Sequence, residues 1–182
     1  MSETTAAASP VSDEWEGLLD KDEQVIWQGR PDASFVATPS MFGVGAFSVF
    51  FTSFALFWMI GASQAGGLFW MFGLIHFSAG LAMFVRTVFG PSFVRARTFY
   101  TLTRRRAFIA KDLPIFGRSL KSYPINANTT IEFKDGRLPS IIFATETRMG
   151  TKGQPSRDIG FERIADGRNV LQLIRDIQRS DT

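Results

Sequence analysis

Side chains suited to acid–base or metal chemistry are scarce in this sequence. Its 182 residues include one histidine, His76, and no cysteine. A zinc site needs several His, Cys or carboxylate ligands, and Cys–His and Ser–His catalytic sets need a histidine beside the nucleophile. Because His76 lies within a long apolar stretch, these sites are excluded from the polar part of the chain.

Two interpretations of His76 stay open. An ionisable side chain in the middle of an apolar span is a candidate proton relay or ligand. The alternative is a neutral imidazole bonded to a neighbouring span or to the backbone. We favour the second, since residues 33–85 hold no acidic partner.

The carboxylates of the C-terminal half show no pairing typical of general acid–base catalysis. They are scattered among predicted strands and turns: Glu132, Asp135, Glu146, Asp158 and Glu162. The sequence also lacks a P-loop, a dinucleotide fingerprint and an Asp-rich metal loop. We therefore predict a protein that is not an enzyme and that needs no cofactor or metal.

The most suggestive cluster is a group of arginines that follows the apolar stretch closely. Anionic lipid headgroups are a natural counter-charge for such a group beside a bilayer, and a protein partner is a second candidate. The alternative to a binding role is equally well supported: the arginines form a solvated strand face and also mark the cytoplasmic side of the membrane. Aromatic residues do not alternate with these arginines as in a nucleic-acid stacking platform, so we expect no nucleic acid. The candidate contact residues are Arg95, Arg97, Arg104, Arg105 and Arg106.

The arginines follow 53 residues, 33–85, without any Asp, Glu, Lys or Arg. A hydrocarbon core about 30 Å thick is crossed by about 20 apolar helical residues, so this stretch is long enough for two spans. Residues 61–67 are small, polar and glycine-rich, which is typical of a turn. We predict a two-helix transmembrane hairpin over residues 33–86, with spans at 41–60 and 67–85.

Charge near the spans predicts their orientation. The turn at 61–67 is uncharged, whereas Arg86 and the arginine cluster follow the second span. Lys and Arg accumulate on the cytoplasmic side, so both termini are expected in the cytoplasm. The first 32 residues hold eight acidic and two basic residues and no apolar core behind a basic start, so no cleavable signal peptide is expected.

Residues 91–182 are predicted to form an α+β domain. Over residues 92–102, two sets of side chains alternate between opposite faces with a period of two, which indicates a strand. Further strands are expected at 106–111, 117–125, 130–134, 140–147 and 158–164. Asp135-Gly136 predicts a tight hairpin with positive φ at both central residues. Asp166 is a candidate N-cap for a final amphipathic helix that buries Val170, Leu173, Ile174 and Ile177.

The N-terminal segment divides in two. Residues 1–20 are acidic and expected to be disordered. Residues 21–32 form a lead segment, in which the β-prone stretch 24–28 is expected to pair with an edge strand of the domain, because proteins tend to cover such edges. Trp27 is expected in the core rather than at the membrane interface.

Three segments resemble the bacterial pleckstrin-homology-like membrane proteins, known as bPH proteins. They are residues 22–31 (DEQVIWQGRP) before the spans, 100–107 (YTLTRRRA) after them, and 159–164 (IGFERI) leading into the final helix. The order of the segments around paired spans strengthens the resemblance, which covers most of residues 22–179. It implies a pleckstrin-homology-like fold, with a bent antiparallel sheet or partial barrel closed by a C-terminal helix, in a bacterial inner membrane. It implies no catalytic residues and no agreed ligand.

These observations lead to a membrane-anchored interaction module that binds a protein partner or anionic headgroups. The alternative is an accessory subunit of a larger membrane enzyme or transporter, which packs through its spans.

Overall fold

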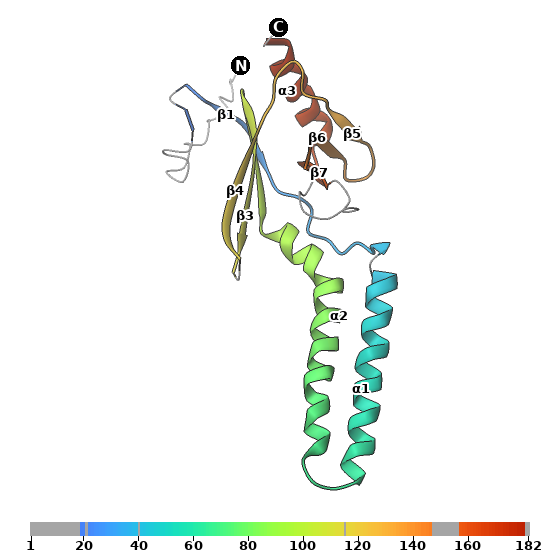
Figure 1. Cartoon of the computed structure of the whole chain (residues 1–182). Helices are drawn as coiled ribbons and strands as arrows, with labels where there is room; N and C mark the ends of the chain where they lie inside the picture. The colour runs from blue at the N-terminus through green and yellow to red at the C-terminus, as the bar shows by residue number, and fades with distance from the viewer. Residues whose placement is uncertain (1–18, 21, 40, 115, 147–156, 181–182) are drawn as a thin grey trace, which may run out of the picture. The chain divides into compact units, whose positions relative to one another are not determined.

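The computed structural model describes residues 19–20, 22–39, 41–114, 116–146 and 157–180 (Figure 1). The chain divides into two compact units. One unit, Ala33–Arg97, is the helical hairpin. The other, the sheet domain, combines the chain up to Asp32 with the chain from Thr98 onward. Most of the acidic segment 1–20, expected to be disordered, lies outside the described residues.

The helical hairpin contains the two expected apolar helices. A π-helical turn, Met41–Gly45, leads into α1 (Ala46–Gln64), and a 3₁₀ turn, Phe69–Met71, leads into α2 (Phe72–Ala96). Taken with their leading turns, both helices are long and apolar enough to cross a membrane. Gly66 and Gly67 have φ of 74° and 75° in the connection, a left-handed conformation that favours glycine.

Small residues bring α1 and α2 together. Ser48 and Ala55 are buried on α1, and Gly73 and Gly80 are buried on α2. A methyl group at Gly80 would overlap the Thr52 side chain. Close contact of small residues is how helices pack where lipid offers no hydrophobic driving force.

The second helix is longer than predicted, and the strand expected from residue 92 is wrong. Helix α2 continues through Pro91 to Ala96, and strand β2 begins only at Thr98. Proline removes one backbone donor, and membrane helices tolerate this loss. Residues 92–96 (SFVRA) are compatible with a helix, whereas the β-branched and aromatic residues that favour a strand are concentrated from Thr98 onward.

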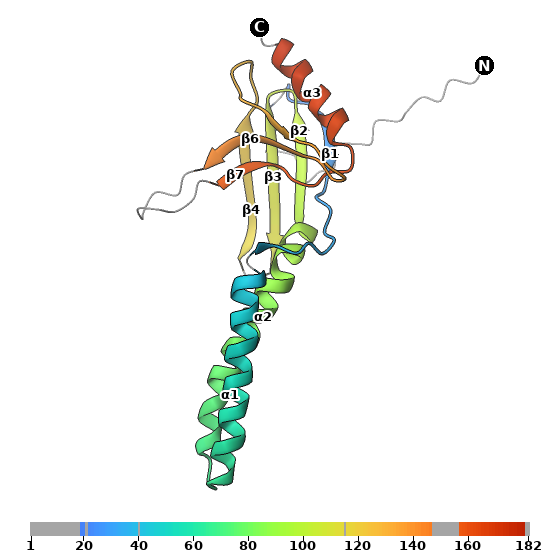
Figure 2. The same ribbon diagram turned by 90° about the vertical axis from the view of Figure 1, so that its right-hand side faces the viewer.

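The sheet domain contains two antiparallel sheets. Strands β1 (Val25–Gly29), β2 (Thr98–Thr103), β3 (Arg106–Leu113) and β4 (Gly117–Pro124) form the first sheet, in that order. Strands β5 (Glu132–Lys134), β6 (Ser140–Glu146) and β7 (Arg157–Phe161) form the second. Figure 2 shows the second sheet crossing in front of the first, with helix α3 (Gly167–Ser180) beside them.

The hydrophobic core joins residues of both sheets and the helix. Phe161 of β7 is fully buried, with its ring centroid 4.9 Å from Tyr100 of β2 and 5.2 Å from Phe143 of β6. Helix α3 contributes Val170, Ile174 and Ile177 to the same cluster, with Leu173 packed against it. The predicted apolar face of the last helix is thus confirmed.

The lead segment pairs with the domain as predicted. Strand β1 runs antiparallel to β2, with Gly29 opposite Tyr100 and Val25 opposite Thr103. The Trp27 ring packs on Phe161, and its Nε1–H donates to the Asp166 carboxylate at 2.7 Å. The expectation that Trp27 is a core residue is confirmed in part: the residue is partly buried and packs against the core cluster.

Two local predictions need correction. Lys134 pairs with Ser140, so the loop from β5 to β6 has five residues instead of the tight two-residue turn expected at Asp135-Gly136. The last strand ends at Phe161 rather than at residue 164. Arg163 has φ 52°, which breaks the strand, while the Ile164 N–H donates to the Pro139 carbonyl.

Candidate functional site

The turn between β2 and β3 is organised by one hydroxyl group. The Thr103 Oγ1 accepts the backbone N–H of Arg106 at 3.1 Å and that of Arg105 at 3.3 Å. The same hydroxyl donates to the Glu23 carboxylate at 2.6 Å. Side-chain hydroxyls that bond backbone groups two or three positions on are typical turn formers. Thr103 therefore both shapes the arginine-bearing turn and connects it to the lead segment.

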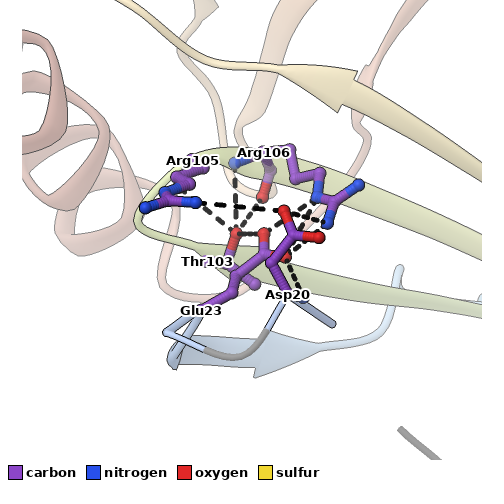
Figure 3. A network of polar contacts seen from close by, with 5 residues as sticks. All are labelled: Asp20, Glu23, Thr103, Arg105 and Arg106. Carbon is purple, nitrogen blue, oxygen red and sulfur yellow. Dashed lines mark hydrogen bonds and ion pairs between the residues drawn. The ribbon is translucent and has the colours of Figure 1, made fainter. Parts of the chain in front are cut away.

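Glu23 receives most of its contacts from Arg106 (Figure 3). The Arg106 Nε donates to both carboxylate oxygens, at 2.9 and 3.1 Å, and its Nη2 lies 2.6 Å from Oε2. Asp20 adds a second carboxylate 3.0 Å from the same Nη2. The side-chain exposure is 0% for Glu23, 27% for Arg106 and 63% for Asp20. A paired carboxylate with donors on both oxygens is the arrangement that makes a buried charge tolerable.

The electrostatics of Glu23 follow from these contacts. Hydrogen bonds from Arg106 are the largest influence and lower the pKa of Glu23 from 4.5 to about 2. Burial acts in the opposite direction, while hydrogen bonds from Thr103 and from the Asp20 backbone reinforce the lowering. Glu23 is therefore ionised near neutral pH, and Arg106 is its counter-ion.

The predicted arginine cluster is divided by the structure. Arg104 and Arg105 form the β2–β3 turn and Arg106 begins β3, whereas Arg95 lies in the last turn of α2 and Arg97 follows that helix directly before β2. Six residues of strand span about 20 Å, so the two groups flank β2 at its opposite ends and do not form one cluster.

Three of the five arginines make contacts within the chain that occupy their guanidinium groups. Arg95 donates to the Ser34 carbonyl at 2.9 Å, Arg97 lies over the Phe93 ring at 5.0 Å, and Arg106 binds Glu23. Arg104 and Arg105 are exposed, although Arg105 lies 3.9 Å from Asp20.

A second feature of the sheet domain is a groove of about 410 Å³, here called the edge groove. Its walls include Tyr123 and Pro124 at the end of β4, the threonines at 129 and 130, and residues 142–145 of β6. Strand β5 pairs with β6 only as far as Ile142. Among the described residues, β6 from 143 onward has no strand partner on that side, so the groove lies along an open strand edge.

Polar side chains connect β4 to β6 beside the groove. The Tyr123 hydroxyl donates to Glu146 at 2.6 Å, and Lys121 Nζ lies 2.7 Å from the same carboxylate. Lys121, followed by Tyr123, lowers the pKa of Glu146, whereas burial and then Glu146 raise the pKa of Tyr123. The residues that line the groove thus include the apolar Ile142 and Phe143, and an ion pair lies beside it.

His76 lies on the exposed surface of α2, and its Nδ1 is 3.4 Å from the Phe72 carbonyl. Such a long contact is a weak hydrogen bond at best. Among the described residues, no group of three or more His, Cys, Asp or Glu side chains is placed to hold a metal ion.

Sequence reasoning missed Glu23 and Thr103. Both belong to short polar stretches that look like solvated segments, and the contacts between Arg106 and Glu23 join residues 83 positions apart. No local pattern in a single sequence signals such a pair.

Comparison with known proteins adds no relative. Neither a family model, nor a curated protein, nor a solved structure matches this chain.

Proposed function

We propose that this protein is a membrane-anchored interaction module with a pleckstrin-homology-like domain, which binds a partner protein and performs no chemistry itself. One observation supports this most directly: the two apolar helices are inserted in the chain between β1 and β2, two hydrogen-bonded neighbours in one sheet. A helical pair that leaves and re-enters a folded domain in this way is suited to anchor the domain to a bilayer.

The same insertion supports the proposed topology. If α1 and α2 cross the membrane, the segments before and after them lie on one side, because β1 and β2 pair with each other. The positive-inside rule assigns that side to the cytoplasm of a bacterial inner membrane. Helix α2 with its 3₁₀ turn is about 42 Å long, more than a core of about 30 Å requires, which leaves Arg95 beyond the hydrocarbon.

The edge groove is the proposed contact for the partner. An extended peptide can add to an open strand edge through main-chain hydrogen bonds, while pockets for alternate side chains give selectivity. The open part of β6 supplies the edge, and Ile142 and Tyr123 supply apolar surface.

Lipid headgroups are the second candidate ligand, and the exposed Arg104 and Arg105 favour it. Each arginine near an anionic leaflet would contribute about 1 kcal/mol of attraction, which fades within a Debye length. Since the spans already anchor the chain, this energy would orient the domain rather than recruit it.

Topology is tested with single cysteines, because the chain has none of its own. An impermeant thiol reagent added to intact cells is expected to label Ser63→Cys, near the connection between the helices, and not Ser180→Cys, at the end of α3. The reverse pattern overturns the orientation, and extraction of the chain from membranes by alkaline carbonate overturns the anchoring.

Partner binding is tested with a photo-reactive amino acid at Thr145, on the groove, in the full chain in its native membrane. A discrete protein adduct is expected there, and it should be absent when Ile142→Glu places a charge among the residues that line the groove. Ser119, exposed on β4 away from the groove, is the matched control position. Adducts with lipid alone, or equal adducts at both positions, contradict the proposal.

A further inference from the structure

The chain leaves the first sheet for the helical hairpin, and returns from the hairpin, at one and the same end of that sheet. Strand β2 begins at Thr98, just after α2, and β1 ends at Gly29, shortly before the hairpin begins. Because β1 and β2 are antiparallel, with Gly29 opposite Tyr100, the end of β1 and the start of β2 lie together. This end of the sheet, marked by Gly29 and Thr98, is here called the entry end.

The connection between β3 and β4 lies at the entry end as well. Lys111 of β3 is opposite Thr98, so β3 continues two residues past the start of β2 and ends at Leu113. Strand β4 then returns from Gly117, which pairs with Leu113. At about 3.4 Å per residue, Leu113 lies about 7 Å beyond Thr98 along the strand direction. The β3–β4 connection therefore projects past the point at which the chain enters β2.

This connection carries apolar side chains, two of them exposed. Phe116 is 81% exposed, Pro114 is exposed as well, and Leu113 is half-buried. These three residues are here called the apolar turn. Of the exposed large apolar side chains that the structure describes, only Phe116 and Leu120 belong to the sheet domain, and all others belong to the unit that holds the apolar helices. A single exposed apolar residue is ordinary, so the place of Phe116 at the entry end is what gives it meaning.

The lengths of the elements put the apolar turn within reach of lipid headgroups. Arg86 is the first charge after the apolar stretch and marks the edge of the hydrocarbon in the proposed membrane placement. Helix α2 continues ten residues beyond it, to Ala96, and so rises at most about 15 Å further. The headgroup layer takes up about 5 to 7 Å of that rise. The remaining gap of at most about 10 Å is comparable to the 7 Å by which Leu113 projects, with the turn extending further.

We propose that the apolar turn contacts the interfacial layer of the bilayer in which the two helices are anchored, and thereby fixes the orientation of the sheet domain on the membrane. This inference rests on the proposed function, since it requires the helices to be in a bilayer. The favourable term is the removal of the Phe116 ring from water.

The charges beside the turn indicate that this contact needs no anionic lipid. Asp112 and Arg118 flank the turn on opposite strands, and their side chains are 3.6 Å apart. Since one charge offsets the other, the contact is expected with neutral lipid as well. It is thus distinct from the electrostatic attraction that Arg104 and Arg105 could provide, and those arginines lie at the other end of β2.

The test places a photo-reactive phenylalanine analogue at position 116 of the full chain in its native membrane, which retains an aromatic ring there. Irradiation is expected to join position 116 to phospholipid, and mass spectrometry detects the adduct. Ala127 is the matched control position, because it is exposed in the loop that follows β4, at the opposite end of that strand. No lipid adduct is expected at position 127.

A second variant tests the apolar character of the contact. Pro114→Asp places a charge on the exposed turn and should reduce the lipid adducts at position 116 about tenfold, which corresponds to about 1.4 kcal/mol. Unchanged hydrogen-exchange protection of β3 and β4 is expected, since Pro114 is exposed.

The possible results separate this inference from the membrane anchoring on which it rests. Equal lipid adducts at positions 116 and 127, adducts with protein alone at position 116, or lipid adducts that Pro114→Asp leaves unchanged overturn the proposal. Release of the chain by alkaline carbonate overturns the anchoring, and the contact of the turn with it. A chain that stays in the membrane but gives no lipid adduct at position 116 overturns the contact alone.

Discussion

The buried ion pair between Glu23 and Arg106 predicts how firmly the lead segment is held. The change to make is Glu23→Gln, which keeps the shape of the side chain and removes its charge. The pKa of Glu23 is lowered from 4.5 to about 2 in the folded protein. At 1.36 kcal/mol per pKa unit this corresponds to about 3 kcal/mol of stability, reduced to about 2 to 3 kcal/mol because Arg106 is partly exposed to solvent.

The pH dependence has a defined sign. Because the folded pKa of Glu23 lies below its unfolded value, the stabilisation is complete above pH 4.5 and is lost as the pH falls toward about 2. The Glu23→Gln protein should be less stable than the wild type at neutral pH. It should also lack the part of the acid-induced loss that Glu23 causes.

Hydrogen exchange of the full chain in detergent, followed by mass spectrometry, measures this effect. Peptides that cover β1 and the β2–β3 turn report the local opening free energy. Asp20→Asn is the matched control: Asp20 also contacts Arg106 but is 63% exposed, so its loss should cost less than about 1 kcal/mol. If Glu23→Gln costs no more than Asp20→Asn, the ion pair does not stabilise the lead segment.

Further predictions concern the rest of the sheet domain. Trp27→Ala should destabilise the domain by about 3 kcal/mol in the same exchange assay, because it removes a large side chain that packs against the core. Gly160→Ala should abolish exchange protection of β6 and β7, since a methyl group there would overlap the Ile141 backbone, which is unable to move aside as a side chain could. Replacing residues 33–97 by a short glycine-rich loop should give a domain that stays soluble and keeps the protection of β1, because β1 and β2 are antiparallel neighbours; loss of that protection would show that the helices are needed for the fold. In that soluble domain, Arg104→Ser with Arg105→Ser should remove any preference for anionic over neutral vesicles, as measured by co-sedimentation at low salt.

The sequence predicted best where one local signal determines the structure. The uncharged stretch 33–85 identified two apolar helices, because charge is costly in a bilayer regardless of other contacts. Alternation and turn residues placed the strands from β3 to β6 within a few residues. The apolar spacing of α3 identified its buried face.

Prediction failed where distant contacts, or a competition between local preferences, determine which structure the residues adopt. The alternation of side-chain types at residues 92–96 is compatible with a strand or a helix. These residues are helical because α2 continues through Pro91 to Ala96. Arg106 looked like one member of a surface cluster, because its partner Glu23 lies on the other side of the helical hairpin in the chain. Arg163 ends β7 early through a backbone conformation that no residue pattern announces.

The insertion of the helical hairpin between β1 and β2 makes anchoring and folding depend on each other. Trp27 bonds to Asp166, 139 positions away, and Glu23 bonds to Arg106, 83 positions away. Both contacts therefore join the segment before the helical hairpin to the segment after it. In the proposed topology these contacts form only if the two ends of the hairpin lie on the same side of the membrane. A chain with one inserted span would hold β1 and β2 on opposite sides, with Glu23 and Arg106 unpaired. The first sheet would then lack an edge strand, and the core would lose the Trp27 ring. Completion of the sheet domain is therefore incompatible with a chain in which only one of the two helices has inserted.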